Sequence, residues 1–416
     1  MRPFFYFPLA LGITLASCNR DEVIPAGGSD VPEENPTPSD EQKLWIMPLA
    51  GTGGEVDRYT FSGRKVCIVA MAPGYTGYFT WMVNGVENSS KDNVLDFIPD
   101  FPGKYSVRVE INTNGILYAS ECDIVAVDAT EKERLRLASP ESSSFSTEVF
   151  EYLPAPGQFV AEAKDVTTPE EASRWAKERL VDGKMVSLGA FGGSLVVGFD
   201  HSILASGNDF DFSVRGNAFI SENGASNEPG IVWVMQDVNG NGLPDDEWYE
   251  LRGSEYYEES TLHNTYVTYY RPESTGMDVM WTDAKGMEGS IKYLFALKPT
   301  GRSYYPAWIE ADSYTLYGSR ISSRNVLNSS GSLWSNNPYP WGYADNIGTD
   351  NLNDPSLGPG SHCGFRIANA VNADGTPVHL TYIDFVRIQC ATQAQSGPLG
   401  EISTEIYSIR DLNTYK

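Results

Sequence analysis

Residues 228–251 read EPGIVWVMQDVNGNGLPDDEWYEL, and this stretch decides the fold class. The five residues Ile231–Met235 are all apolar, so they lack the alternation of a strand that has one face in water. A short apolar run that ends at turn residues is typical of a strand buried on both faces. The stretch therefore predicts a strand inside a β-rich core, followed by a polar loop.

That loop carries oxygen-bearing side chains at the spacing of a calcium-binding loop. Counted from Asp237, positions 1, 3, 5 and 9 are Asp or Asn, and position 6 is glycine. Calcium takes six to eight oxygen ligands, and clustered carboxylates repel each other without a cation. Position 12 is Trp248 and not the glutamate of an EF-hand, so Glu247 or Asp246 has to complete the shell. An acidic hairpin turn without metal is the alternative. The predicted ligands of a structural calcium ion are Asp237, Asn239, Asn241, Asp245 and Glu247.

Runs with strand character dominate the chain on both sides of this loop, among them residues 194–199, 266–270 and 381–389. One helix is predicted, because Thr168-Pro169-Glu170-Glu171 combines a capping box with proline at the first helical position. Asp182-Gly183 ends this helix, since glycine supplies a C-cap. The sequence therefore predicts an all-β protein with one short helix.

Two domains are expected. Residues 44–128 contain short alternating runs separated by turns such as Asn84-Gly85, and a Ser-rich stretch at 139–144 follows them. The stretches 79–85 and 101–107 resemble the middle of a PKD-type immunoglobulin-like domain, which implies an N-terminal sandwich. Residues 129–416 are then a larger, jelly-roll-like β-sandwich.

The chain begins with the parts of a bacterial export signal. Arg2 precedes an apolar run from Phe4 to Ala16, which is too short to span a bilayer as a helix. Leu15-Ala16-Ser17-Cys18 resembles the lipobox of bacterial lipoproteins, which implies removal of residues 1–17 and acylation of Cys18. An ordinary signal peptide is the alternative. We expect the lipid on Cys18 to be the only membrane anchor.

Residues 18–43 are rich in proline and acidic residues and poor in large apolar ones, as is typical of a disordered, solvated tether. The pair Asp21-Glu22 resembles the surface-export signal of Bacteroides-type lipoproteins. The resemblance implies a surface-exposed protein on the cell outer membrane. The formal net charge of -25 argues against nucleic acid or an anionic membrane surface as a partner.

Four cysteines remain besides Cys18. An even number in an oxidising compartment permits two disulfides, and buried free thiols are the alternative. The sequence leaves both open for Cys67, Cys122, Cys363 and Cys390.

Enzyme signatures are scarce. The sequence has no His-x-x-x-His pair, no Gly-x-Ser-x-Gly elbow and no P-loop. Ser361-His362-Cys363 puts a nucleophile type beside an imidazole, but adjacent residues on a strand point to opposite faces. The sequence predicts a binding protein and no catalytic residues.

The candidate binding residues lie in the aromatic stretch 332–346. A long loop with this composition is uncommon unless it is functional. Tryptophan and tyrosine offer a large contact area with a polar handle, and asparagine offers both donors and acceptors. Packing of half of these rings in the core is the alternative, but we expect Trp334, Tyr339 and Trp341 at the surface. The predicted ligand contacts are Trp334, Asn336, Asn337, Tyr339, Trp341 and Tyr343.

Several sequence segments, named at the end of this paragraph, together resemble a family of secreted, jelly-roll-like β-sandwich domains. With the PKD-like domain and the lipobox, the chain resembles the surface lipoproteins encoded beside vitamin B12 transporters in gut anaerobes. The resemblance covers residues 60–410. The segments are Gly192–Asp200, Gly207–Phe210, Gly216–Phe219, Glu228–Val234, the loop after Asp237, Trp341–Asn346, Tyr382–Ile388 and Gly400–Ile406.

This resemblance implies binding of a corrinoid such as cobalamin and its transfer to a TonB-dependent outer-membrane transporter. A corrinoid is an apolar macrocycle fringed by amides, so aromatic, Asn, Gln and Ser side chains suit it. The same side chains suit sugars, so glycan binding is the second hypothesis. A purely adhesive or structural surface domain is the third.

Overall fold

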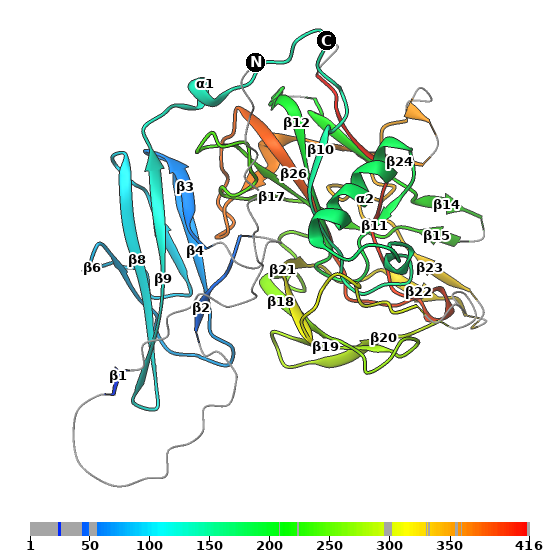
Figure 1. Ribbon diagram of the computed structural model, residues 1–416, viewed down its shortest axis with the longest axis horizontal. Coiled ribbons are helices and arrows are strands. Elements are labelled where there is room, and N and C mark those ends of the chain that lie inside the picture. Colours follow the sequence, from blue (N-terminus) through cyan, green and yellow to red (C-terminus); the bar gives the residue numbers. More distant parts are fainter. Residues whose placement is uncertain are drawn as a thin grey trace, which may run out of the picture.

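The chain is almost entirely β-structure, as predicted, and forms a smaller N-terminal domain beside a larger domain (Figure 1). No helix in the described part of the chain is both long and apolar enough to cross a membrane. Cys18 and nearly all of the predicted tether lie outside the described residues. The computed structural model describes residues 24–25, 44–49, 56–207, 209–222, 224–294, 302–329, 331, 333–353, 357–358 and 360–413.

The N-terminal domain is the predicted sandwich of two sheets. One sheet has the order β1-β9-β8-β5-β6, with β3 parallel to β9, and the other has the order β2-β4-β7. Trp81 lies fully buried in the core between them. Asn84-Gly85 forms the predicted tight turn, with both residues at positive φ. The strands are β1 (Ile24–Pro25), β2 (Trp45–Ile46), β3 (Arg58–Phe61), β4 (Val66–Met71), β5 (Thr80–Val83), β6 (Val86–Glu87), β7 (Val94–Phe97), β8 (Gly103–Thr113) and β9 (Ile116–Val127).

A six-stranded antiparallel sheet forms the centre of the large domain, and β16 (Gly230–Met235) lies inside it. All six residues of β16 are buried. Val232 and Val234 pack into the main core, whereas Ile231, Trp233 and Met235 pack into a second core. The prediction of a strand buried on both faces is confirmed. The sheet order is β10 (Glu148–Leu153), β12 (Ser194–Leu204), β26 (Tyr382–Cys390), β16, β17 (Tyr249–Leu251) and β25 (Ala370–Val371).

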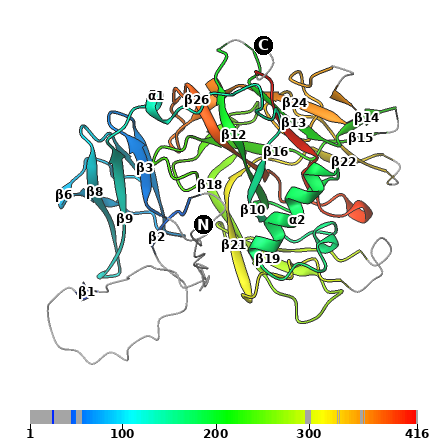
Figure 2. The same ribbon diagram turned by 45° about the horizontal axis from the view of Figure 1, so that its top comes forward.

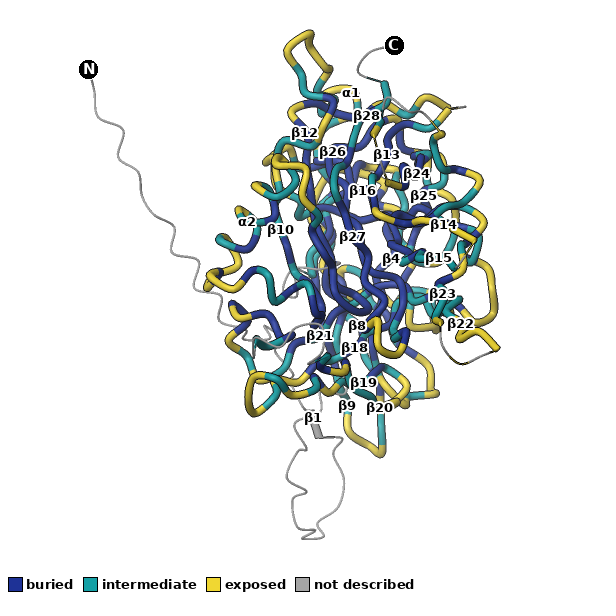
Figure 3. Tube along the Cα trace, turned by 90° about the vertical axis from the view of Figure 1, so that its right-hand side faces the viewer, coloured by how far each residue is buried: buried dark blue, intermediate teal, exposed yellow. Residues whose placement is uncertain are grey.

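Smaller sheets surround this central sheet, so that the buried chain lies along its strands and the exposed chain forms the rim (Figure 3). One sheet contains β24 (Ser361–Phe365), β13 (Phe212–Gly216) and β28 (Ser408–Asp411); another contains β20 (Glu288–Ile291), β19 (Val279–Asp283), β18 (Leu262–Tyr270) and β21 (Ser313–Arg320). The two-stranded pairs are β11 (Val186–Ser187) with β27 (Glu405–Ile406), β14 (Phe219–Ser221) with β15 (Gly224–Ser226), and β22 (Asn325–Leu327) with β23 (Trp334–Asn336).

The predicted helix is α2 (Pro169–Val181), which packs against β10 (Figure 2). The Thr168 side chain accepts the Glu171 amide as an N-cap, and Gly183 follows the C-cap at positive φ. A second helix, α1 (Glu131–Arg134), was not predicted. Its signal was present, because Thr130 and Glu133 form a capping box. Three short 3-10 helices complete the described structure: Val160–Glu162, Ile367–Asn369 and Gly397–Leu399.

The four described cysteines are free and buried, so the free-thiol alternative holds in this structure. Burial raises the pKa of the Cys390 thiol to about 11. The other three thiols also have raised pKa values, with burial as the main cause. These thiols act as small apolar core groups.

Candidate binding cleft and cation loop

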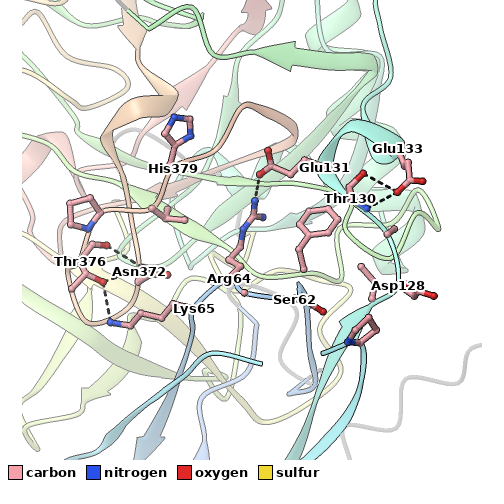
Figure 4. Close-up of a pocket in the computed structure, with 17 residues that line it drawn as sticks. Ser62, Arg64, Lys65, Asp128, Thr130, Glu131, Glu133, Asn372, Thr376 and His379 are labelled. Atoms are coloured by element: carbon pink, nitrogen blue, oxygen red, sulfur yellow. Dashed lines mark hydrogen bonds and ion pairs between the residues drawn. The ribbon is translucent and has the colours of Figure 1, made fainter. Parts of the chain in front are cut away.

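A cleft of about 1100 Å³ lies where the two domains meet (Figure 4). One wall is the turn after β3 together with the end of β9 and α1, and the other is the segment after β25. Small-molecule sites favour domain interfaces, and a volume of about 1000 Å³ is at the upper end of their usual range. The side chains that define it are Phe61, Ser62, Arg64, Lys65, Glu131, Asn372, Thr376 and His379.

Charged and polar groups of both signs line the cleft. Arg64 pairs with Glu131, and its guanidinium lies over the Phe61 ring at 4.9 Å. Lys65 forms ion pairs with Asp374 and Asp96 and also hydrogen-bonds to Thr376, which fixes its ammonium at the junction. His379 is exposed on the wall that belongs to the large domain (Figure 4). The cleft therefore offers donors, acceptors and one buried aromatic ring.

The sequence did not reveal this cleft, because its walls come from segments about 300 residues apart and none of them has a ligand-binding motif. The one local signal was the capping box of α1, which places Thr130 and Glu131 at the rim.

The predicted calcium loop folds around the side chain of Asp237. Its Oδ1 accepts the Gly240 amide at 2.8 Å, and its Oδ2 accepts the Gly242 amide at 3.0 Å. Both glycines have positive φ, a conformation that favours glycine and lets the loop curl inward. On the opposite side, the Asn239 and Asn241 carboxamides both donate to the Asp245 carboxylate, at 2.9 and 2.7 Å. Three of the five predicted ligands therefore contact one another, a fourth, Asp237, holds the loop backbone from the other side, and calcium binding stays a prediction.

The prediction of Glu247 as the fifth ligand is wrong. Glu247 is buried in an ion pair with Arg58 of the N-terminal domain, with Arg58 Nε 3.0 Å from Glu247 Oε2, although this contact lacks hydrogen-bond geometry. The adjacent Asp246 turns back into the loop instead, where its Oδ2 accepts the Val238 amide at 2.8 Å. Burial, together with the charges of Asp245 and Asp237, raises the pKa of Asp246 to about 8.

The aromatic loop is less open than predicted. Tyr339 and Tyr343 are each 2% exposed and belong to the second core, so the expected surface position of Tyr339 is wrong. Backbone groups satisfy both hydroxyls: Tyr339 donates to the Ser322 carbonyl, and Tyr343 accepts the Glu255 amide. With its polar tip satisfied, each ring gains more from core burial than from exposure.

The remaining residues of this predicted site divide between surface and interior. Asn336 is buried, donates to Glu228 and accepts from Ser396, so its amide is already used. Trp334 and Trp341 are half-buried, and Asn337 is exposed. Ligand contact by these last three residues stays a prediction, and none of them lines the interdomain cleft.

A second acidic cluster, which the sequence did not reveal, joins Glu228, Asp345 and Glu405 within 4.8 Å of one another. Asp345 Oδ1 accepts the amides of Asn217 and Ala218, and its Oδ2 accepts the Glu405 amide. Burial raises the pKa of all three carboxyls, and repulsion from neighbouring acids adds to the rise for Glu228 and Glu405. No sequence motif signals this cluster, because its members are up to 177 positions apart in the chain.

Comparison with known proteins identifies no family. No family model matches the chain, and neither does any curated protein. Among solved structures, the chain is similar to one described in terms of carbohydrate-binding modules of the β-sandwich superfamily (9% identity, 90% of this chain and 98% of that chain, TM-score 0.17). It is also similar to a quinoprotein alcohol dehydrogenase-like protein from Bacteroides thetaiotaomicron (11%, 88%, 99%, TM-score 0.17). Likeness at this TM-score carries no argument about function.

Proposed function

We propose that this chain is a lipid-anchored surface protein that binds a corrinoid in the interdomain cleft and passes it, unchanged, to a TonB-dependent outer-membrane transporter. The observation that carries the proposal is the cleft itself, which both domains build and which hydrogen-bonding side chains line. The ligand class rests on the sequence resemblance. The absence of catalysis is part of the same hypothesis.

The chemistry of the cleft suits a large ligand with many amides. Buried amides that lack a partner cost roughly 1–3 kcal/mol each, so a corrinoid site must offer both donors and acceptors. Ser62 and Thr376 offer exposed hydroxyls, Arg64 and Lys65 supply cationic donors, Glu131 supplies a carboxylate, and Pro102 and Pro377 supply exposed apolar surface. We therefore place the ligand in this cleft and not at Tyr339 and Tyr343, whose rings are enclosed in the core.

A cleft-filling variant tests the site. Ser62 is exposed, lies in the turn after β3 and lines the cleft, so Ser62→Trp should block the ligand without disturbing a core. We expect calorimetry with cobalamin to show a loss of affinity of at least about tenfold, or about 1.4 kcal/mol. Ser62→Ala is the matched control and should bind like the wild type.

The outcomes separate ligand from site. Wild-type protein that gives neither heat nor corrinoid absorbance would reject the corrinoid and favour the glycan alternative, which a glycan panel would then address. Cobalamin binding that survives Ser62→Trp but is lost in Trp341→Ala would keep the ligand and move it to the aromatic loop.

The anchor is tested separately. Cys18→Ala should release the protein from the membrane fraction, because a solvated tether and an acidic domain offer no other apolar anchor. Fractionation with a lipid-label assay checks this, and thermal melting should show an unchanged fold. A Cys18→Ala protein that stays with the outer membrane would contradict the lipid anchor.

A further inference from the structure

We propose that the loop Asp237–Asp246 binds a calcium ion and that the loaded loop fastens the N-terminal domain to the large domain. The inference is independent of the ligand in the cleft, because it rests only on the loop and its contacts. Two sets of observations carry it: the oxygen-bearing side chains that the loop holds, one of them with a buried unpartnered oxygen, and the arginines that contact the loop from outside.

The first observation is an unpartnered oxygen on a fully buried acid. Asp246 is 0% exposed, and its Oδ1 has no hydrogen-bond partner among the described residues. Its Oδ2 accepts the Val238 amide, which places the carboxylate against the first turn of the loop, beside Asp237. A buried carboxylate oxygen without a donor is costly, and either a proton or a bound cation relieves that cost.

The second observation is the arrangement of the two asparagines. Both carboxamides donate to Asp245, and their oxygens accept the backbone amides of Asn241 and Leu243, so the loop holds these three oxygen-bearing side chains side by side. In the loaded loop a cation would neutralise Asp245 in place of the two NH₂ donors, and each carboxamide would turn its oxygen from the backbone amide toward the ion. No described lysine or arginine hydrogen-bonds to the carboxylates of Asp237, Asp245 or Asp246.

The ligand type favours calcium. The loop offers three carboxylates and two carboxamides on a backbone with two glycines, and flexible oxygen cages of this kind suit calcium. Magnesium is smaller, requires near-ideal octahedral geometry and keeps several waters, so a wide protein cage binds it less tightly.

Arginines from outside the loop bind residues at both of its ends. Arg64 of the N-terminal domain hydrogen-bonds to Gln236, immediately before the loop, and Arg58 pairs with Glu247, immediately after it. Arg134 of α1 donates to the Val238 carbonyl at 3.0 Å. The acceptors Gln236 Oε1, Val238 O and Glu247 are therefore positioned by the loop that the cation would hold.

A single ion thus links three parts of the chain. Without a cation, repulsion among the three carboxylates opens the loop and moves the acceptors away from their arginines. With calcium, the loop closes and the domain junction is held. We call the contacts of Arg58, Arg64 and Arg134 with the loop the latch. Arg64 and Glu131 also line the cleft, so the latch lies in one of the cleft walls.

Calorimetry on the full chain after chelation tests the site. We expect one calcium ion to bind, more tightly than magnesium, and Asp246→Asn to weaken binding by at least about tenfold. Asn241→Ala should do the same; Asn241 is exposed, so this variant stays informative if Asp246→Asn fails to fold. Asp165→Asn, whose side chain is 87% exposed on a distant loop, should bind calcium like the wild type.

Limited trypsinolysis tests the latch, because α1 at the domain junction contains Lys132 and Arg134. Calcium should slow cleavage there at least about tenfold by suppressing local opening, and magnesium should not. Gln236→Ala removes an acceptor of the latch but no ligand oxygen, so it should bind calcium and still lose protection.

Two results would overturn the proposal. Calcium binding unchanged by both Asp246→Asn and Asn241→Ala would place any cation elsewhere, for example at Glu228, Asp345 and Glu405. Calcium binding at the loop with no change in cleavage at α1 would reject the latch. Neither assay contains a corrinoid, so failure here is distinguishable from failure of the proposed function.

Discussion

Replacing Tyr339 by alanine is expected to lower the free energy of unfolding of the large domain by about 3–5 kcal/mol, the usual cost of deleting a large buried aromatic side chain. The ring packs against Tyr343 with 5.3 Å between centroids, and the Arg324 guanidinium lies 4.8 Å from its centre. Its hydroxyl donates to the Ser322 carbonyl at 2.8 Å. Alanine would therefore leave a cavity and an unpaired carbonyl.

Urea denaturation followed by tryptophan fluorescence measures this effect. Tyr339→Phe keeps the ring and removes only the hydroxyl, so it should cost about 1 kcal/mol. Trp341→Ala, at a half-buried position of the same loop, should cost less than Tyr339→Ala. A stable Tyr339→Ala protein that has merely lost ligand affinity would show that the ring belongs to a binding surface after all.

Tyr339 is buried although the sequence predicted a surface position, and this difference has a physical cause. A cluster of Trp, Tyr, Asn and Pro is as typical of a binding loop as of a loop that folds back on a core. The decision depends on partners outside the loop: the Ser322 carbonyl accepts the Tyr339 hydroxyl, the Glu255 amide donates to the Tyr343 hydroxyl, and both rings lie in the second core. Composition contains no information about those partners, so the sequence could not make the choice.

Local patterns predicted local structure well. The apolar run of β16, the Asn84-Gly85 turn and the cap of α2 depend on neighbouring residues, and the structure confirms all three. Within the calcium-like spacing, Asn239 and Asn241 contact Asp245 while Asp237 binds the loop backbone, and metal binding by these residues stays a prediction. The spacing failed at Glu247, because the pairing of that residue is decided by Arg58, about 190 positions away.

Strand β26 shows where periodicity misleads. Val386 and Ile388 alternate with Arg387 and Gln389, a pattern typical of one face in water. Yet Arg387 is 0% exposed, because β21 covers that face and the Tyr317 carbonyl accepts its guanidinium. Burial lowers the pKa of Arg387 to about 10, while Glu151 and Glu250 nearby favour its charged form. Only the tertiary arrangement of the sheets reveals this buried cation.

The largest pH effect is expected from the cluster of Glu228, Asp345 and Glu405, with chelator present. Burial raises the pKa of these carboxyls in the folded chain above their unfolded values, and repulsion from neighbouring acids adds to the rise for Glu228 and Glu405. The folded state then keeps protons that the unfolded state releases above about pH 4.5. Stability therefore falls as the pH rises from there through the raised values, by about 1.4 kcal/mol for each pKa unit of the rise.

Glu405→Gln tests this expectation, because an uncharged amide of similar shape removes one repelling charge from the buried cluster. Glu405 is 2% exposed, and the Ser187 hydroxyl donates to its Oε1 at 3.2 Å, a contact that the glutamine oxygen can keep. Between about pH 5 and pH 8 we expect the wild type to lose at least about 2 kcal/mol of unfolding free energy, and Glu405→Gln to lose clearly less.

Glu288→Gln, at an exposed strand position, is the control and should follow the wild type. Other buried acids, such as Asp246, add to the wild-type slope, so the difference between the variants is the decisive quantity. Identical slopes for all three proteins would mean that the cluster is already neutralised, either by shared protons that it never releases in this range or by a cation that chelation does not remove.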